Sequence, residues 1–208
     1  MTEKIVFYHN PRSRASMVHV MLEEVGADYE TRVLDLQKRE HKTPEFLAIN
    51  PMGKLPTIVD RGVAVTETPA IIAHLADLYP QAGLAPALGD PQRGAYYRWL
   101  VFGASCFEPA MLDVMLKREP VDKGTAGYGS FEDVLATLKS ALTPGPYLLG
   151  ERFSAADVYI GSELNWAMMF GAPGIKGEPV FDDYVARVTQ RPAFQRAQAQ
   201  SMAAEGAA

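Results

Sequence analysis

The chain has 208 residues, of which 48% are hydrophobic, and its formal net charge is −5 with a pI near 5.4. This length and composition allow a sizeable core in one large or two small domains, and they exclude disorder as the main state. Because no run of Lys and Arg exceeds a dipeptide, we expect a small-molecule partner and no nucleic acid.

The first third of the chain alternates short strand-like runs with helix-like runs. A Pro-, Gly- and Ala-rich segment at 80–91 follows it and indicates an interdomain linker. In chain order, the expected elements are a strand at 4–8, a helix at 13–25, a strand at 29–34, an irregular helical stretch at 44–49, strands at 56–60 and 63–65 joined by a tight hairpin, and a helix at 67–78.

The remainder of the chain carries apolar residues at helical spacing. We expect helices at 92–117, 131–142, 155–170 and 181–190, separated by loops. Ser154 and Asp157 form a capping-box pattern at the start of the third of these helices, where their expected role is in folding. The fold class is therefore α/β for 1–80, followed by an all-α domain at 90–208.

The apolar runs and the cysteine content limit where the protein can be located and which redox chemistry it can perform. The run from Ile5 to Tyr8 is too short for a signal-peptide core, and no other segment is long enough to cross a bilayer. The single cysteine, Cys106, excludes an internal disulfide and a Cys-x-x-Cys redox pair. We expect a cytoplasmic protein that has no membrane partner and no metal.

The segment Asn50-Pro-Met-Gly-Lys-Leu-Pro-Thr-Ile58 combines a turn with a proline at the start of a strand. A cis Leu55–Pro56 bond is one explanation, and it would leave the backbone of Leu55 free to pair with an extended peptide ligand. An ordinary trans proline at a strand start is the alternative.

This segment, followed by Glu67-Thr68, resembles the glutathione-site signature of the cytosolic glutathione transferases, and most closely their bacterial, theta- and beta-like members. The resemblance spans about residues 4 to 200 and implies a thioredoxin-like glutathione-binding domain at 1–80. It places the γ-glutamyl end of glutathione at Glu67 and Thr68, where the helix N-terminus at Thr68 suits the carboxylate of that end. A plain helix cap is the alternative for this pair.

The resemblance also assigns the opposite end of glutathione. It places the glycine carboxylate at His41 and Lys54, for which solvated surface charges are the alternative. It also favours the cis form of the Leu55–Pro56 bond, which we therefore predict, so that the backbone of Leu55 would hold the middle of the ligand.

The resemblance places the residue that activates the glutathione thiol in the segment 7–15, which runs from the end of the first strand to the start of the first helix. A free thiol has a pKa of about 8.5, so the enzyme must stabilise the thiolate. Ser13, at a helix start, is the first candidate, and a simple N-cap is its alternative role. Tyr8 is the rival, with a core aromatic as its alternative role, and Asn10 is third.

The resemblance implies a homodimeric transferase, typical of detoxification, that conjugates the glutathione thiolate to an apolar electrophile. The all-helical domain would shape the electrophile pocket, with Phe102, Met111 and Met115 as candidate lining residues. A glutathione-dependent isomerase or dehalogenase would use the same glutathione site. A non-catalytic binding protein of this family is the alternative from another class.

Overall fold

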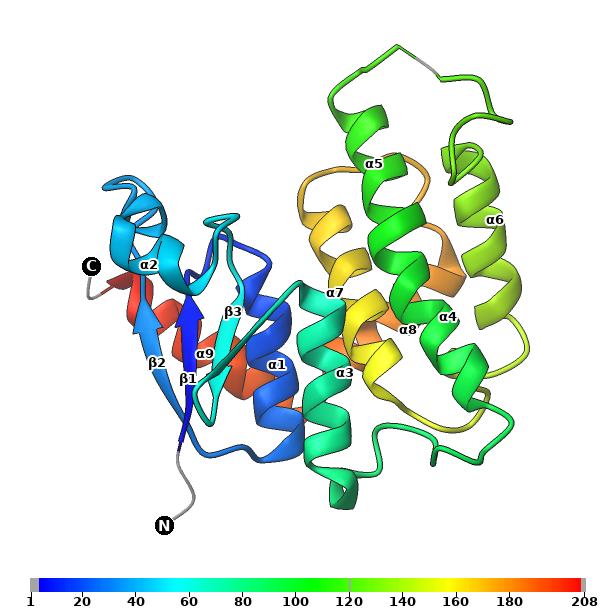
Figure 1. The fold of residues 1–208 in the computed structure, drawn as a ribbon. Helices are drawn as coiled ribbons and strands as arrows, with labels where there is room; N and C mark the ends of the chain where they lie inside the picture. The colour runs from blue at the N-terminus through cyan, green and yellow to red at the C-terminus, as the bar shows by residue number, and fades with distance from the viewer. Residues whose placement is uncertain (1–3, 120, 207–208) are drawn as a thin grey trace. The chain divides into compact units, whose positions relative to one another are not determined.

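The computed structural model describes residues 4–119 and 121–206, and they fall into two compact units (Figure 1). The described residues of Met1–Ala82 and Pro192–Ala208 form the first unit, and Gly83–Arg191 form the second. The C-terminal segment is where this division differs from the expected domains at 1–80 and 90–208. It belongs with the first unit, because its helix α9 (Pro192–Gly206) packs on α1 (Ala15–Val25).

The first unit is built on a four-stranded sheet in the order β2-β1-β3-β4. Strand β1 pairs in parallel with β2 and antiparallel with β3, which in turn pairs antiparallel with β4. The elements of this unit, besides α1 and α9, are β1 (Ile5–His9), β2 (Tyr29–Val33), η1 (Glu40–Lys42), α2 (Pro44–Ile49), β3 (Thr57–Asp60), β4 (Val63–Thr66), α3 (Thr68–Leu78) and η2 (Pro80–Ala82). The expected order of elements and the thioredoxin-like fold are confirmed.

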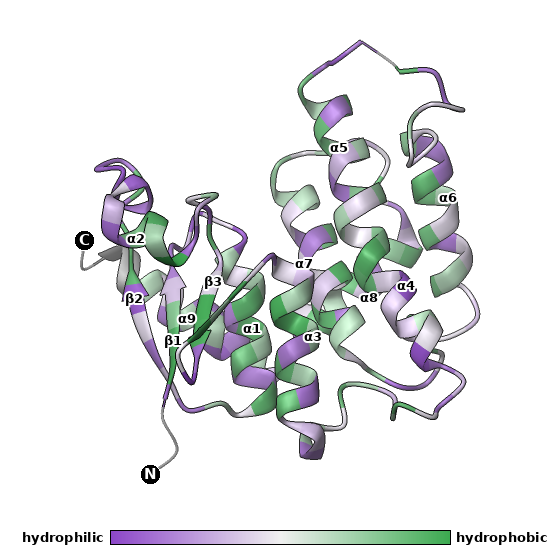
Figure 2. Ribbon diagram, viewed as in Figure 1, coloured by the Kyte–Doolittle hydropathy of each residue, from purple (hydrophilic) through white to green (hydrophobic). Residues whose placement is uncertain are grey.

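Helices cover the two faces of this sheet because successive residues of β1 point to opposite sides. The ring of Phe7 lies 5.7 Å from the ring of His19 on α1, and the ring of Tyr8 lies 5.2 Å from that of Phe46 on α2. Figure 2 shows hydrophobic residues along β1 and β3 and on α1, where this core is formed. The sheet is therefore covered by helices on both faces.

The second unit consists of helices. They are α4 (Arg93–Phe102), the π-helical turn η3 (Gly103–Phe107), α5 (Glu108–Met115), α6 (Phe131–Leu142), α7 (Ala155–Met169) and α8 (Pro179–Thr189). The expected helix at 92–117 is interrupted at η3, where a Cβ on Gly103 would lie 2.5 Å from the ring of Tyr159 on α7. None of the helices in the described parts of the chain combines the length and apolar character needed to span a membrane.

The carboxylate of Asp157 holds the start of α7. It accepts hydrogen bonds from the backbone N–H of Ser154 at 2.9 Å, the hydroxyl of Ser154 at 2.8 Å, the N–H of Leu148 at 2.8 Å and the hydroxyl of Tyr184 at 3.0 Å. Burial raises the pKa of Asp157, and these hydrogen bonds oppose the shift. The capping box thus also ties α7 to α8 and to the preceding turn.

We expect Asp157→Ala to destabilise the protein by about 3–5 kcal/mol, because several buried donors lose their acceptor at once. Thermal unfolding should show a midpoint that is lower by roughly 6–15 °C. Asp133→Ala is the matched control, since Asp133 caps α6 through Ser130 in the same way but is exposed to solvent. Equal melting temperatures for the two variants would contradict a special role for the buried network.

Candidate glutathione site

Three loops meet at one end of the sheet. Tyr8 on β1 lies opposite Thr57 on β3, and Thr57 lies opposite Thr66 on β4. Because these neighbouring strands are antiparallel, β1 and β4 end where β3 begins. The segments brought together at this end are therefore 10–13, 54–56 and 67–68, which contain most of the expected site residues.

The buried side chain of Asn50 shapes the loop before β3. Its amide nitrogen donates to the carbonyl of Lys54 at 2.9 Å and to the hydroxyl of Thr57 at 3.0 Å. Its amide oxygen accepts from the N–H of Met52 at 3.1 Å. The sequence analysis gave Asn50 no role beyond the motif, although an Asn that begins a turn is a known signal for such side-chain to backbone bonds.

The Leu55–Pro56 bond that follows is cis, as predicted. Both residues are buried, yet the backbone N–H and C=O of Leu55 have no hydrogen-bond partner within the described parts of the chain. Buried backbone groups are almost always paired, so an unpaired amide here is suited to an extended ligand.

The junction between β4 and α3 is strained at Glu67. This residue has φ 65° and ψ 118°, a left-handed backbone that favours glycine. Helix α3 begins directly after it, at Thr68, and Pro69 supplies no N–H in the first turn. The free N–H groups and the positive dipole end of α3 therefore face the end of the sheet where the three loops meet.

Cations converge on the other side of this end. His41 lies in η1, and Lys42 donates to the carbonyl of Met52 at 2.8 Å, which attaches η1 to the loop before β3. Burial lowers the pKa of His41, as do the charges of Lys42, Lys54 and Arg39, so its imidazole is a neutral hydrogen-bonding group at pH 7. The sequence analysis did not single out Lys42.

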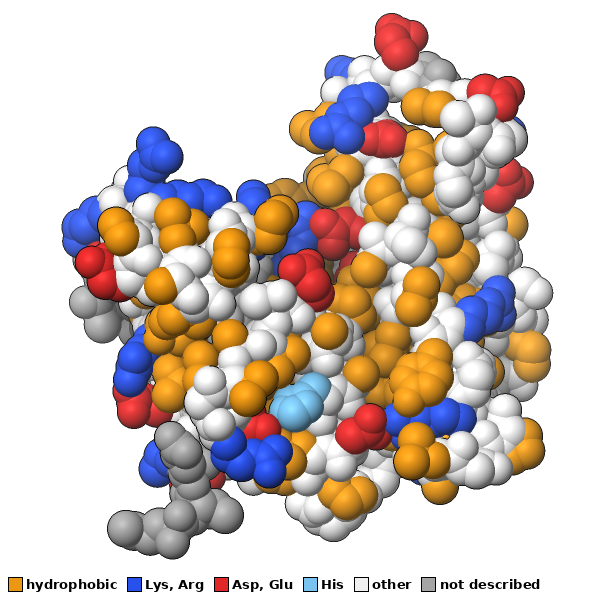
Figure 3. All heavy atoms as spheres, viewed as in Figure 1, with side chains coloured by type: hydrophobic (Ala, Val, Ile, Leu, Met, Phe, Trp, Pro, Cys, Tyr) orange, Lys and Arg blue, Asp and Glu red, His pale blue; other side chains and the backbone are white. Residues whose placement is uncertain are grey.

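Figure 3 shows Lys and Arg side chains gathered over the part of the first unit that holds α2. These charges stand out on a chain whose net charge is −5. An anionic group of a ligand is therefore favoured at this place.

Ser13 and Asn10 form a hydrogen-bonded turn between β1 and α1. The hydroxyl of Ser13 donates to the carbonyl of Asn10 at 2.7 Å and accepts from the N–H of Ala15 at 3.2 Å. The side chain of Asn10 donates to the carbonyl of Leu34 at 2.9 Å and accepts from the N–H of Arg12. Asn10 thus holds the loop, and the half-buried Ser13 stands just before the first turn of α1.

Tyr8 lies in a different environment. Its side chain is 7% exposed and packs against Phe46, and its hydroxyl accepts a hydrogen bond from the guanidinium of Arg32 at 3.3 Å. This arrangement matches the alternative role of a core aromatic.

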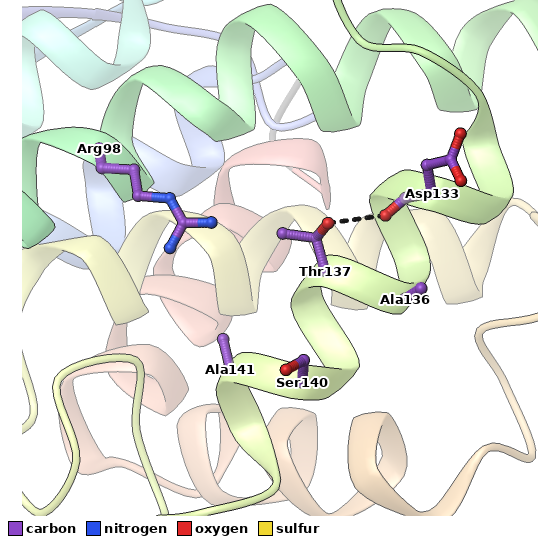
Figure 4. A pocket seen from close by; sticks show the side chains of 6 residues that line it. All are labelled: Arg98, Asp133, Ala136, Thr137, Ser140 and Ala141. Carbon is purple, nitrogen blue, oxygen red and sulfur yellow. Dashed lines mark hydrogen bonds between the residues drawn. The ribbon is translucent and has the colours of Figure 1, made fainter.

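The candidate electrophile residues lie on α4 and α5. Met111 is 1% exposed and belongs to the core of the second unit, whereas Phe102 and Met115 are half-buried. A separate groove of about 480 Å³ runs between α4 and α6, and its lining contains none of the expected site residues. In Figure 4, Arg98 on α4 faces Thr137 and Ala141 on α6, and the hydroxyl of Thr137 donates to the carbonyl of Asp133.

No group of three or more His, Cys, Asp or Glu side chains within the described residues could hold a metal ion. The chemistry that this site offers comes from hydroxyl and amide donors, a helix N-terminus and fixed cations. Such groups suit a peptide-like ligand that carries a carboxylate at each end.

Comparisons with known proteins show the family of the chain. Residues 3–77 match the family model described as "Glutathione S-transferase, N-terminal domain". The chain is 37% identical over 177 residues to glutathione S-transferase 1 of Dianthus caryophyllus, with 78% of this chain and 77% of that protein covered.

Solved structures add to this likeness. A sphingomonad glutathione S-transferase in complex with glutathione is 33% identical, with a TM-score of 0.77 and coverage of 94% of this chain and 98% of that one. A glutathione transferase from Methylococcus capsulatus is 29% identical, with a TM-score of 0.81 and coverage of 96% and 99%. The chain belongs to the glutathione S-transferase family, as its sequence indicates.

Gly53→Ala should lower both stability and glutathione affinity. Gly53 has φ +56°, and a Cβ there would lie 2.6 Å from the carbonyl oxygen of His41 and 2.7 Å from Nζ of Lys42, so the cation cluster must shift. Gly62→Ala is the matched control, because its φ of +79° is also left-handed but its Cβ would have nothing within 4 Å. Calorimetric titration with glutathione should show a weaker Kd for Gly53→Ala alone, and equal affinities would argue against this role for the loop.

Proposed function

We propose that the protein is a glutathione transferase that conjugates the glutathione thiolate to an apolar electrophile. The observation that carries the proposal is the meeting, at one end of the sheet, of the unpaired Leu55 backbone, the N-terminus of α3 and the hydroxyl of Ser13. The glutathione bound to the sphingomonad relative supports the same ligand here.

Each end of glutathione has a complementary group. The γ-glutamyl end would bind at Glu67 and Thr68. Its carboxylate would accept from the free first N–H groups of α3, and its ammonium group would donate to the carboxylate of Glu67. The glycine carboxylate would bind Lys54 and Lys42, with His41 as a neutral donor. The cysteinyl backbone between them would pair with Leu55 in the manner of an added antiparallel strand.

The thiol of a ligand held in this way would reach the start of α1. Its pKa of about 8.5 must fall before the thiolate dominates at pH 7, and a hydroxyl donor at a helix N-terminus favours the anion. Ser13 would turn its hydroxyl from the carbonyl of Asn10 to the sulfur, while Asn10 keeps the loop in place. Attack of the thiolate on an electrophilic carbon then forms the conjugate, and the carbon's leaving group departs with its electron pair.

The second unit would bind the electrophile, with Phe102 and Met115 as the partly exposed apolar side chains on α4 and α5. We place the enzyme in the cytoplasm as a homodimer, which is usual for the family. Its subclass, theta- or beta-like, remains a hypothesis based on Ser13 and His41.

Thr68→Ala should weaken glutathione binding by about 1–3 kcal/mol, the scale of a hydrogen bond to a charged group. Isothermal titration calorimetry measures this, with Thr31→Ala, an exposed position on β2, as the control for a lost threonine. Unchanged affinity in a folded Thr68→Ala variant would contradict the assignment of this helix end.

Ser13→Ala should raise the pKa of bound glutathione by about 1–2 units, each worth about 1.4 kcal/mol, because the thiolate loses its donor. Tyr8→Phe should change this pKa little, since the hydroxyl of Tyr8 is engaged with Arg32. The measurement is a pH titration of thiolate absorbance with glutathione bound, together with turnover of a panel of apolar electrophiles.

The outcome of that titration separates the alternatives. A large shift in Tyr8→Phe and none in Ser13→Ala would reverse the assignment of the activating hydroxyl. Glutathione binding without a lowered thiol pKa and without turnover of any electrophile would identify a non-catalytic binding protein.

A further inference from the structure

A buried polar cluster joins α9 to α1. The ring of His19 on α1 contacts Oγ of Ser201 through Nδ1 at 3.1 Å and Oε1 of Gln200 through Nε2 at 2.7 Å, both on α9. The ring of His9, at the end of β1, lies 5.1 Å from that of His19, and its Nε2 is 3.5 Å from the same Ser201 hydroxyl. His9 is 1% exposed and His19 is 3% exposed.

The hydrogen-bond partners of the two histidine rings define the protonation state of this cluster. Nε2 of His19 lies 2.7 Å from the amide oxygen of Gln200 and 3.0 Å from the hydroxyl of Tyr29, which itself donates to Glu23. Nε2 therefore carries the proton, and Nδ1 then accepts from the hydroxyl of Ser201. That hydroxyl oxygen accepts in turn from Nε2 of His9, whose Nδ1 is buried without a hydrogen-bond partner among the described residues. Both rings are therefore neutral, and a second proton on His9 would be a buried donor with no acceptor.

Charged and titratable groups surround these rings from each element packed against them. Glu23 on α1 accepts from Tyr29 on β2 at 2.7 Å and pairs with Arg196 on α9 at 2.7 Å. Burial, followed by the charge of His19, lowers the pKa of His9 to about 3. Burial also lowers the pKa of His19, against the opposing effects of Gln200 and Glu23.

We propose that α9 separates from α1 at mildly acidic pH. In the closed state, with α9 packed on α1, the cluster cannot accommodate the protons that His9 and His19 take up. The connection to α8 is short, because α8 ends at Thr189 and α9 begins at Pro192. Because α9 contributes no strand to the sheet, its release leaves the strand pairing unchanged.

The direction of the effect follows from linkage. A histidine with a depressed pKa in the closed state binds fewer protons than the same histidine in water. The packing of α9 on α1 therefore becomes less stable as the pH falls below about 6.5. For one histidine that is neutral when closed and has a pKa of 6.5 when open, the open population rises about 25-fold between pH 7 and pH 5. Glu23 reduces this factor for His19, so His9 should contribute more.

Hydrogen exchange of the full chain, followed by mass spectrometry and corrected for intrinsic rates, tests this inference. Peptides from α9 should lose protection by about 25-fold from pH 7 to pH 5, whereas α6, far along the chain, serves as an internal reference. His9→Gln/His19→Gln should lose this pH dependence. His74→Gln should keep it, since His74 bonds to Asp60 outside the cluster.

The proposal would be overturned if the protection of α9 in the wild-type protein changed less than threefold between pH 7 and pH 5. An unaltered pH dependence of this protection in the double variant would also overturn it. Should the double variant fail to fold, NMR of the four histidine rings in the wild-type protein decides instead. The rings of His9 and His19 should protonate only as α9 loses protection. Midpoints near pH 6.5 with α9 still protected would show that the cluster accepts protons while closed.

Discussion

The antiparallel pairing of β1 with β3 determines where each candidate residue lies. It places the start of β3 beside the end of β1, and the β3–β4 hairpin then returns the chain to the same end of the sheet. Loops that are distant in sequence thereby meet over a rigid platform. If β3 ran in parallel, Leu55 and Ser13 would lie at opposite ends of the sheet, and no single peptide could contact both.

The polar groups of the protein are of two kinds, those that remain available to a ligand and those that are paired within the protein. At the loop end, backbone groups and cations remain available to a ligand, because Asn50 and Asn10 satisfy the surrounding backbone with their side chains. In the second unit, the buried carboxylate of Asp157 is instead engaged with donors of the protein itself. An acidic chain can thus present a locally positive site without a large basic surface.

The sequence allowed most of the fold to be predicted, because strands and helices of the first unit carry distinct periodicities and end at Gly or Pro. The motif around Leu55–Pro56 also predicted the cis bond. Helix α9 was missed, since its Ala- and Gln-rich sequence lacks a clear apolar stripe, although Pro192 stands at its first position. The link of Lys42 to the loop before β3 depends on tertiary contact, and no local pattern encodes it.

The return of α9 to the first unit also affects how the protein folds during synthesis. The thioredoxin-like unit is not one continuous stretch of chain, because Pro192 and the residues after it are synthesised only after the whole second unit. Until then, the side of α1 that carries His19 and Glu23 has no cover from α9. The first unit therefore stays incomplete until the whole helical unit has been translated, so completion of the two units is coupled in time although each has its own core.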